Sequence, residues 1–263
     1  TVTSSNAGTI SSGMTATSSQ TWCTATVSGN IVTIKVSENS GNTSRTATVY
    51  VTYLNSQSQT FDVVQDSDGP ATVTIGGVQW TLYNLENPQQ ASGGATFATK
   101  LPSECSGIRA DSHGKFYQWG VNVAWSSSSS PSSTPSGNWQ SSLTSITSWS
   151  TSPCPTGYRL PTNTEWTNLI NACNRSNGGG WSTSDYGYII LTDKTNSSRK
   201  LEFVSNGRLS SSKTLEYKGT WGGHWASGQA NSAIGYSMYF NKDGAYSSDD
   251  TKTLGRSIRC VRQ

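Results

Sequence analysis

Residues 1–68 alternate apolar and polar side chains in short runs that are rich in β-branched residues. The runs cover residues 31–36, 46–53 and 61–65, and turn-forming residues separate them at 29–30 and 38–42. In the second run Ala47, Val49 and Val51 occupy every other position, which is the period of a strand with one buried face. Regularly spaced strands without a helical pattern predict a β-sandwich.

The segment 66–70, Asp-Ser-Asp-Gly-Pro, interrupts this pattern. Gly-Pro ends a strand and starts a turn, so the segment predicts a domain boundary. Two short apolar runs follow at 73–75 and 78–80, and the glycines between them predict a tight hairpin. The predicted domains are residues 1–68 and 69–263.

The clearest helical pattern begins at Thr162. Thr162 and Glu165 have the T-x-x-E spacing of a capping box, in which each side chain accepts a hydrogen bond from the backbone of the other residue. Apolar residues then recur at the spacing of one helix face, at Trp166, Leu169, Ile170 and Cys173. The pattern predicts a helix from Thr162 to about Cys173.

Residues 126–137 are almost entirely serine and proline and can bury little apolar surface. They predict a surface loop inserted into one core, and a linker between two domains is the alternative. The insertion is favoured because tryptophans flank the segment on both sides. These tryptophans are Trp119, Trp125, Trp139 and Trp149.

Charged residues make up only 13% of the 263-residue chain, and Ser, Thr, Asn and Gly replace them. Ser, Thr and Asn compete with the helix backbone for hydrogen bonds, so this composition favours strands and ordered loops. The ten Trp and eleven Tyr argue against disorder. The net charge of +3 includes no basic block, so nothing favours nucleic acid or an anionic membrane as a partner. No apolar run reaches the roughly 18 residues of a membrane span, and no signal peptide is visible.

Domain 1–68 carries a set of features found together in one known family. They are Trp22, Ile34 and Val36 in the first run, Asn39 before a turn, and the segments 45–49 and 61–65. The domain resembles the BACON family, an immunoglobulin-like module common in gut Bacteroidetes. The resemblance implies a spacer, with a carbohydrate- or mucin-binding role as the alternative.

A second set of motifs runs in order through domain 69–263. The motifs are 73–80 with Asn84-Leu85, 114–119, 154–162 with Glu165-Trp166, 225–227 and 255–262. The CPxGYRLPTxxEW and GRSIRCVR motifs resemble the Fibrobacter-succinogenes-type major paralogous domain. That family belongs to the formylglycine-generating-enzyme-like branch of the C-type lectin fold, which includes the variable proteins of diversity-generating retroelements. The expected chain is mostly β, with an immunoglobulin-like β-sandwich followed by an α+β domain of C-type lectin fold.

Five cysteines without a CxxC pair and only two histidines argue against a zinc site. Cys154 and Cys260 both lie in the family motifs, and the resemblance makes them the candidate disulfide, with two packed free thiols as the alternative. A bond between them would close a loop of roughly a hundred residues and stabilise the fold by about 4 kcal/mol in the chain-entropy model. Cys105–Cys173 is a weaker second pairing. One or two disulfides with an odd thiol suit an oxidising compartment.

The sequence offers little for catalysis. Enzymes of this branch use a reactive cysteine pair near the C-terminus, where this chain has only Cys260. The one adjacent carboxylate pair, Asp249-Asp250, would point to opposite faces of a strand. No GxSxG, HExxH or P-loop motif is present, and the carboxylates do not match the calcium-binding triplets of lectins. We expect no enzyme activity, no cofactor and no metal.

The segment 220–253 carries the candidate binding face. If Tyr236, Met238 and Phe240 point to the core, alternation places Ser237, Tyr239 and Asn241 on the outer face. In retroelement-diversified relatives this stretch holds the variable, ligand-facing positions. By resemblance these correspond here to His224, Ser237, Tyr239, Asn241, Asp243, Ser248, Asp249, Asp250 and Thr251, with Trp221 and Tyr246 as further anchors.

The expected function is non-catalytic ligand binding, as in the variable protein of a diversity-generating retroelement. The partner would be a cell-surface protein or glycan, and the protein would act outside the cell, at a bacterial surface or on a phage virion. Two alternatives remain open: a structural fimbrial or tail-fibre subunit, and a carbohydrate-active accessory protein.

Overall fold

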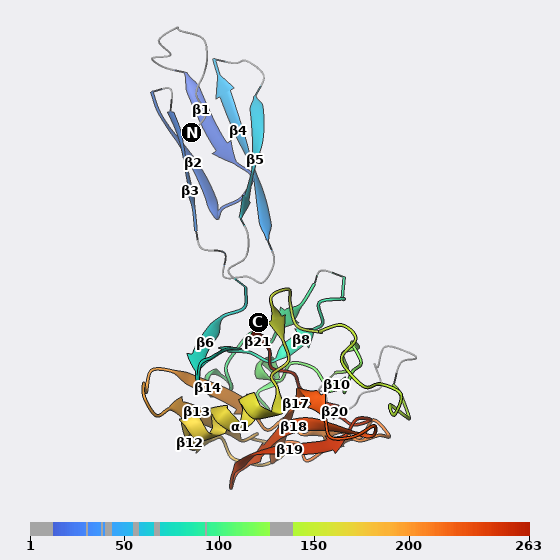
Figure 1. The fold of residues 1–263 in the computed structure, drawn as a ribbon. Coiled ribbons are helices and arrows are strands. Elements are labelled where there is room, and N and C mark those ends of the chain that lie inside the picture. The colour runs from blue at the N-terminus through green and yellow to red at the C-terminus, as the bar shows by residue number, and fades with distance from the viewer. Residues whose placement is uncertain are drawn as a thin grey trace. The chain divides into compact units, whose positions relative to one another are not determined.

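The computed structural model divides the chain into two compact units, Thr1–Gly69 and Pro70–Gln263 (Figure 1). It describes residues 13–29, 31–37, 39, 44–54, 58–65, 69–92, 94–126 and 139–263. Antiparallel strands dominate both units, so the expectation of a mostly β chain is confirmed. Among the described residues no helix is both long and apolar enough to cross a membrane.

The first unit consists of two small antiparallel sheets. One has the order β1-β4-β5 and the other pairs β2 with β3. The strands are β1 (Met14–Ser18), β2 (Cys23–Ser28), β3 (Ile31–Val36), β4 (Arg45–Tyr53) and β5 (Gln59–Gln65). The three strands predicted from alternation are confirmed as β3, β4 and β5, whereas β1 and β2 were not predicted. Residues 66–68 of the predicted boundary segment 66–70 and most of the 38–42 turn lie outside the described residues.

Alternation along β4 creates the core of the first unit. Ala47 and Val49 are fully buried and pack with Cys23, while Tyr50 on the opposite face is 42% exposed. Arg45 closes one end, because its guanidinium lies 4.2 Å from the centre of the Trp22 ring and donates hydrogen bonds to the Gln65 side chain.

The second unit contains several small sheets and one α-helix. The strands are β6 (Thr72–Ile75), β7 (Val78–Thr81), β8 (Leu85–Asn87), β9 (Thr96–Phe97), β10 (Tyr117–Gln118), β11 (Tyr158–Arg159), β12 (Cys173–Gly178), β13 (Tyr188–Asp193), β14 (Lys200–Val204), β15 (Arg208–Leu209), β16 (Leu215–Glu216), β17 (Trp221–Gln229), β18 (Ile234–Asn241), β19 (Ala245–Thr251), β20 (Gly255–Arg256) and β21 (Val261–Arg262). The sheet orders are β11-β21-β7-β6, β10-β20-β15-β16, β12-β13-β14, β17-β18-β19 and β8-β9. Two 3-10 turns, Pro102–Glu104 and Ala110–Ser112, lie between β9 and β10.

The predicted hairpin and helix are both present. β6 and β7 pair around Gly76 and Gly77, whose φ angles of 61° and 79° require the left-handed region that glycine adopts easily. Helix α1 (Asn163–Ala172) begins at Thr162 with the reciprocal capping box to Glu165. It ends one residue earlier than predicted, because Cys173 turns into strand β12.

Two hydrophobic cores lie on the two faces of the β17-β18-β19 sheet. Met238 and Phe240 of β18 pack into the first core with α1, β13 and β14. Trp225 of β17 faces the other way and packs into the second core with Trp119 and Ile258. This sheet therefore lies between the two cores. We call the side of the sheet that carries Trp225 its outer face, and the side that carries Met238 and Phe240 its inner face.

The second core contains a disulfide between Cys154 and Cys260, which joins the segment before α1 to the residue that precedes the last strand, β21. Cys105 and Cys173 are free thiols, so the second pairing considered from the sequence is absent. Cys173 instead packs in the first core.

The tryptophans that flank the Ser/Pro-rich segment pair across it. Trp119 lies 5.9 Å from Trp149, and Trp125 lies 4.9 Å from Trp139, measured between ring centres. Both pairs belong to one compact unit, as expected for an insertion into a single core. Residues 127–138 themselves lie outside the described part of the chain.

Candidate functional site

Four aromatic side chains form a continuous row on the outer face of the β17-β18-β19 sheet. Tyr217, in the turn after β16, stacks on Trp221 with ring centres 4.6 Å apart. Trp221 lies 5.2 Å from Tyr239, and Tyr239 stacks on Tyr246 at 5.3 Å. We call Tyr217, Trp221, Tyr239 and Tyr246 the aromatic row. It crosses all three strands and extends beyond them to the turn.

The pairing register explains why these rings meet. Tyr239 lies directly opposite Tyr246, and Trp221 lies opposite Asn241, so their side chains share one face of the sheet. The outer members remain accessible: Tyr217 is 46% exposed and Tyr246 is 47% exposed, with Trp221 and Tyr239 half-buried between them. Accessible aromatic side chains gathered in this way are typical of binding surfaces.

A network of ion pairs borders the row. Arg208 lies 5.1 Å from the centre of the Tyr217 ring and pairs with Glu216 and Asp250, each at 3.1 Å. Asp250 also accepts a hydrogen bond from Arg256. Burial lowers the pKa of Arg256, and the charge of Asp250 opposes that shift. Asp250 therefore holds two arginines in place. The sequence predicted that Asp250 contacts the ligand, whereas in the structure its carboxylate is engaged in these ion pairs.

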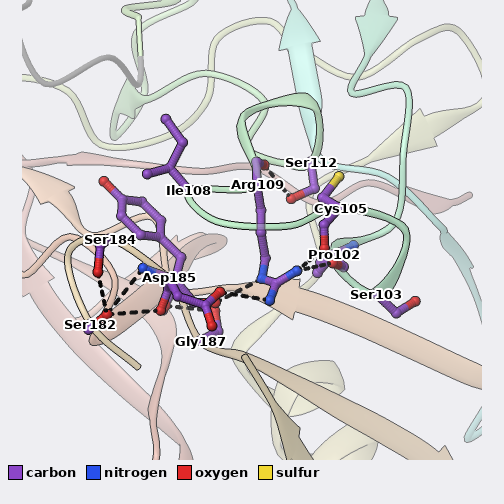
Figure 2. Close-up of polar contacts among 12 residues, drawn as sticks. Pro102, Ser103, Cys105, Ile108, Arg109, Ser112, Ser182, Ser184, Asp185 and Gly187 are labelled. Carbon is purple, nitrogen blue, oxygen red and sulfur yellow. Dashed lines mark hydrogen bonds and ion pairs between the residues drawn. The ribbon is translucent and has the colours of Figure 1, made fainter. Parts of the chain in front are cut away.

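Arg109 clamps a pair of loops together next to this region (Figure 2). Its Nε donates to the Tyr186 carbonyl at 2.8 Å and its Nη1 to the Pro102 carbonyl at 3.0 Å. Its Nη2 pairs with Asp185 at 3.0 Å. The guanidinium also lies 4.8 Å from the centre of the Tyr188 ring, so the clamp is nearly enclosed.

The clamped loop supports the turn that carries Tyr217. Gly187 donates to the carbonyl of Gly219 at 3.1 Å, and a Cβ on Gly219 would lie only 1.9 Å from the Ser182 carbonyl oxygen. Tyr217 has a φ of 55°, which bulky residues rarely adopt. The Tyr217 carbonyl accepts hydrogen bonds from the backbone N–H groups of Thr220 at 3.1 Å and Trp221 at 3.0 Å. The close packing holds Tyr217 in this conformation against Trp221.

Two residues predicted to contact ligand are buried. His224 lies on the inner face with no exposed surface, where its Nε2 bonds Asn84 Oδ1 at 2.8 Å and Phe203 packs against its ring. Desolvation lowers its pKa well below the usual value, and the nearby Arg259 charge adds to that effect. Ser237 is on the predicted outer face but lies beside Trp225, where the second core covers it. Both side chains are fully buried, so neither is accessible to a ligand in this structure, contrary to the exposed positions expected from the sequence.

Asn241 and Asp243 shape the β18-β19 turn. Asn241 is half-buried, and its Oδ1 accepts hydrogen bonds from the backbone of Asp243 at 2.9 Å and of Gly244 at 3.0 Å. The Asp243 side chain is exposed, while its carbonyl accepts a hydrogen bond from Arg175 at 3.0 Å. The Asp243 side chain is therefore exposed on the turn, and Asn241 acts mainly as the support of that turn.

The remaining predicted residues separate along β19. Ser248 is half-buried on the outer face, opposite the buried Ser237. Asp249 and Thr251 are exposed but lie opposite Tyr236 and Ile234, on the inner face. The predicted set is thus divided: Trp221, Tyr239 and Tyr246 form part of the row, Ser248 is half-buried on the same face, and Asp243 is exposed on the turn after β18.

The sequence interpretation missed Tyr217 and Arg208. Both precede the segment 220–253, and neither belongs to a motif. Tyr217 is an aromatic residue in a polar stretch, and that signal alone is too weak to locate a site. The β15-β16 hairpin brings them to the row from outside the predicted segment.

The side chains of this surface are suited to van der Waals contact and hydrogen bonding with a partner. In the described part of the chain no three His, Cys, Asp or Glu side chains gather as a metal site would require. Two carboxylates that border the row are paired with arginines, Glu216 with Arg208 and Asp250 with Arg208 and Arg256. The other buried histidine, His113, stacks on Tyr186, and burial lowers its pKa to about 4.

Comparison with known proteins identifies the first unit only. Residues 11–66 match the profile of the BACON family, described as a "putative binding domain, N-terminal". The BACON resemblance of domain 1–68 is therefore confirmed. No curated protein and no solved structure matches the chain.

Proposed function

We propose that this protein is a non-catalytic binding protein whose ligand contacts the aromatic row on the second unit. The row itself carries the proposal: four stacked rings cross a three-stranded sheet and stay accessible at both ends. Burying these rings against a partner would remove a large apolar area from water at little cost in side-chain entropy, since aromatic side chains have few rotatable bonds. The BACON match of the first unit, a binding-domain family, supports the same general function.

The arrangement around the row supports binding rather than catalysis. A general acid or base needs an accessible titratable group close to the reacting atoms. Here Asp250 is engaged by Arg208 and Arg256, and His224 lies beneath the sheet on its other face. We propose accordingly that the protein has no enzyme activity.

The finer proposal is that the second unit has a C-type lectin fold and is a retroelement-diversified variable protein. Its basis is the sequence resemblance of the CPxGYRLPTxxEW and GRSIRCVR motifs. Diversified positions must tolerate exchange, so we restrict them to accessible residues such as Tyr239, Asp243 and Tyr246 and omit the buried His224 and Ser237. The proposed location is outside the cell, on a bacterial surface or a phage virion.

The neighbouring DNA tests the diversification proposal. We expect a reverse-transcriptase gene nearby and an imperfect copy of the codons for residues 220–262 whose differences lie at adenines. A locus without such a copy would end the proposal of diversification and leave the binding function to be judged separately.

Cell binding tests the function itself. The labelled intact chain is incubated with whole bacterial cells from a gut community and with mucin-coated beads, and retention is measured by flow cytometry. We expect Tyr239→Ala to abolish retention, because Tyr239 lies inside the row. Tyr50→Ala is the matched control, since Tyr50 is 42% exposed on the first unit. Equal retention by both variants would contradict the proposed role of the row.

A further inference from the structure

Taking the proposed function as its basis, we infer that the aromatic row binds a polypeptide surface rather than a glycan. The inference comes from the orientation of the rings. Trp221 and Tyr217 are nearly parallel at 17°, and Tyr239 and Tyr246 at 24°. Parallel rings with centres only 4.6 to 5.3 Å apart must overlap face to face with an offset. The rings therefore stand on edge in the row and do not lie flat on the sheet.

This orientation leaves few flat ring faces for a sugar. A pyranose binds an aromatic side chain by laying its C–H groups over an open ring face. The inner rings, Trp221 and Tyr239, each have neighbours on both sides within the row. Tyr217 is covered on one side by Trp221, and Arg208 lies over its ring at 5.1 Å. Among the described residues only the outer side of Tyr246, on the edge strand, has neither a ring nor a cation against it.

The edges of the row are instead a line of hydrogen-bond donors. The hydroxyls of Tyr217, Tyr239 and Tyr246 and the indole N–H of Trp221 donate to no other described residue. Arg208 uses Nε and Nη1 in its ion pairs, and its Nη2 donates to none of the residues that the structure describes. These donors suit a partner rich in carbonyl acceptors, which loops and strand edges of a polypeptide expose.

Charge at the row favours a neutral partner. The two cations next to it, Arg208 and Arg256, are balanced by Glu216 and Asp250. This local balance gives no attraction to the carboxylates of an acidic glycan. Tyrosine, tryptophan and arginine are also the residues most enriched in the central contacts of protein interfaces. The row supplies tyrosine and tryptophan, and Arg208 beside Tyr217 adds the arginine.

Two probes distinguish the ligand classes. The first is a displayed library of random peptides, linear and disulfide-constrained, selected on the intact chain. The second is an array of purified neutral and acidic glycans. Dissociation constants are then measured for wild type, Trp221→Ala, Tyr239→Ala, Tyr246→Ala and Tyr50→Ala, and melting curves establish that each variant is folded.

We expect enriched peptides that depend on the centre of the row. Trp221→Ala and Tyr239→Ala should weaken peptide binding at least about thirtyfold, and Tyr246→Ala by about fivefold or less, because central contacts dominate interfaces. If Tyr239→Ala is poorly folded, Tyr239→Phe keeps the test intact, since loss of the hydroxyl alone should weaken binding about two- to tenfold. Tyr50→Ala should bind as wild type.

Glycan binding that is lost in Tyr246→Ala and kept in Tyr239→Ala would overturn the polypeptide assignment while preserving the proposed function. Peptide binding that no row variant reduces would also overturn it. If neither probe binds in a way that depends on the row, the proposed function fails together with the inference.

Discussion

The outer face of the β17-β18-β19 sheet is buried at one end and accessible at the other. At one end Trp225 and Ser237 are fully buried, and Trp119 packs so closely on Gly235 that a Cβ there would lie 2.5 Å from its ring. At the other end, four residues earlier in β17 and two residues later in β18, Trp221 and Tyr239 are half-buried and lead to the exposed Tyr246. Both ends obey the same alternation and the same register.

The difference comes from what covers the face. Strands β15 and β20 bring Arg208 and Arg256 over the sheet, where Asp250 binds both. Gly223 makes this approach possible, because a Cβ at that position would lie 1.9 Å from Arg256 Nη1. The arginines mark the border between core and binding surface. Alternation therefore predicts which face of the sheet a residue occupies. Whether that part of the face is accessible depends on the segments that pack against it.

The largest effect is expected at the covered end. Trp225→Ala should lower the free energy of unfolding by about 3–5 kcal/mol, because it leaves a cavity beneath Arg256 in the second core. Urea unfolding followed by circular dichroism measures this. A loss below about 1 kcal/mol would mean that this end is not packed as a core.

The border itself is the next target. Asp250→Asn removes the charge that compensates the buried Arg256, and we expect a loss of about 3 kcal/mol in the free energy of unfolding. The double variant Asp250→Asn with Arg256→Met removes the uncompensated cation and should recover part of that loss. If the double variant is less stable than Asp250→Asn alone, the ion pair does not define the border.

Mild acid tests the covered packing without a mutation. His113 titrates at about pH 4 in the folded protein and near pH 6.5 when unfolded, so below pH 6.5 the unfolded state binds the extra proton. The free energy of unfolding should fall by about 2 kcal/mol from pH 7.5 to pH 5 for this residue. His224 shifts in the same direction and adds to the fall. Both histidines of the chain belong to the second unit, so the first unit serves as the control. Equal stability of the second unit at both pH values would contradict the burial of its histidines.

The smallest effect on stability is expected at the open end. Tyr246→Ala should change the free energy of unfolding by less than about 0.5 kcal/mol, because the side chain is nearly half exposed on an edge strand. The same unfolding experiment provides the measurement. A loss comparable to that of Trp225→Ala would show that the row is part of the core and not a surface.

The sequence alone determined the local elements. The β6-β7 hairpin follows from Gly76-Gly77 between two apolar runs, and helix α1 follows from the capping box of Thr162 and Glu165. Alternation in β18 correctly assigned Met238 and Phe240 to the core and Tyr239 to the opposite face. These features depend on residues close together in the chain, so their physical causes can be read in order.

Only the tertiary structure decided which outward residues a partner can reach. Ser237 and Tyr239 have the same alternation, yet Ser237 is covered by the second core and Tyr239 is not. His224 is enclosed by Asn84 and Phe203, and Tyr217 and Arg208 join the row from beyond the predicted segment. Accessibility depends on packing between segments that are distant in sequence. A local pattern of apolar and polar residues cannot predict which distant segment will pack against a given face.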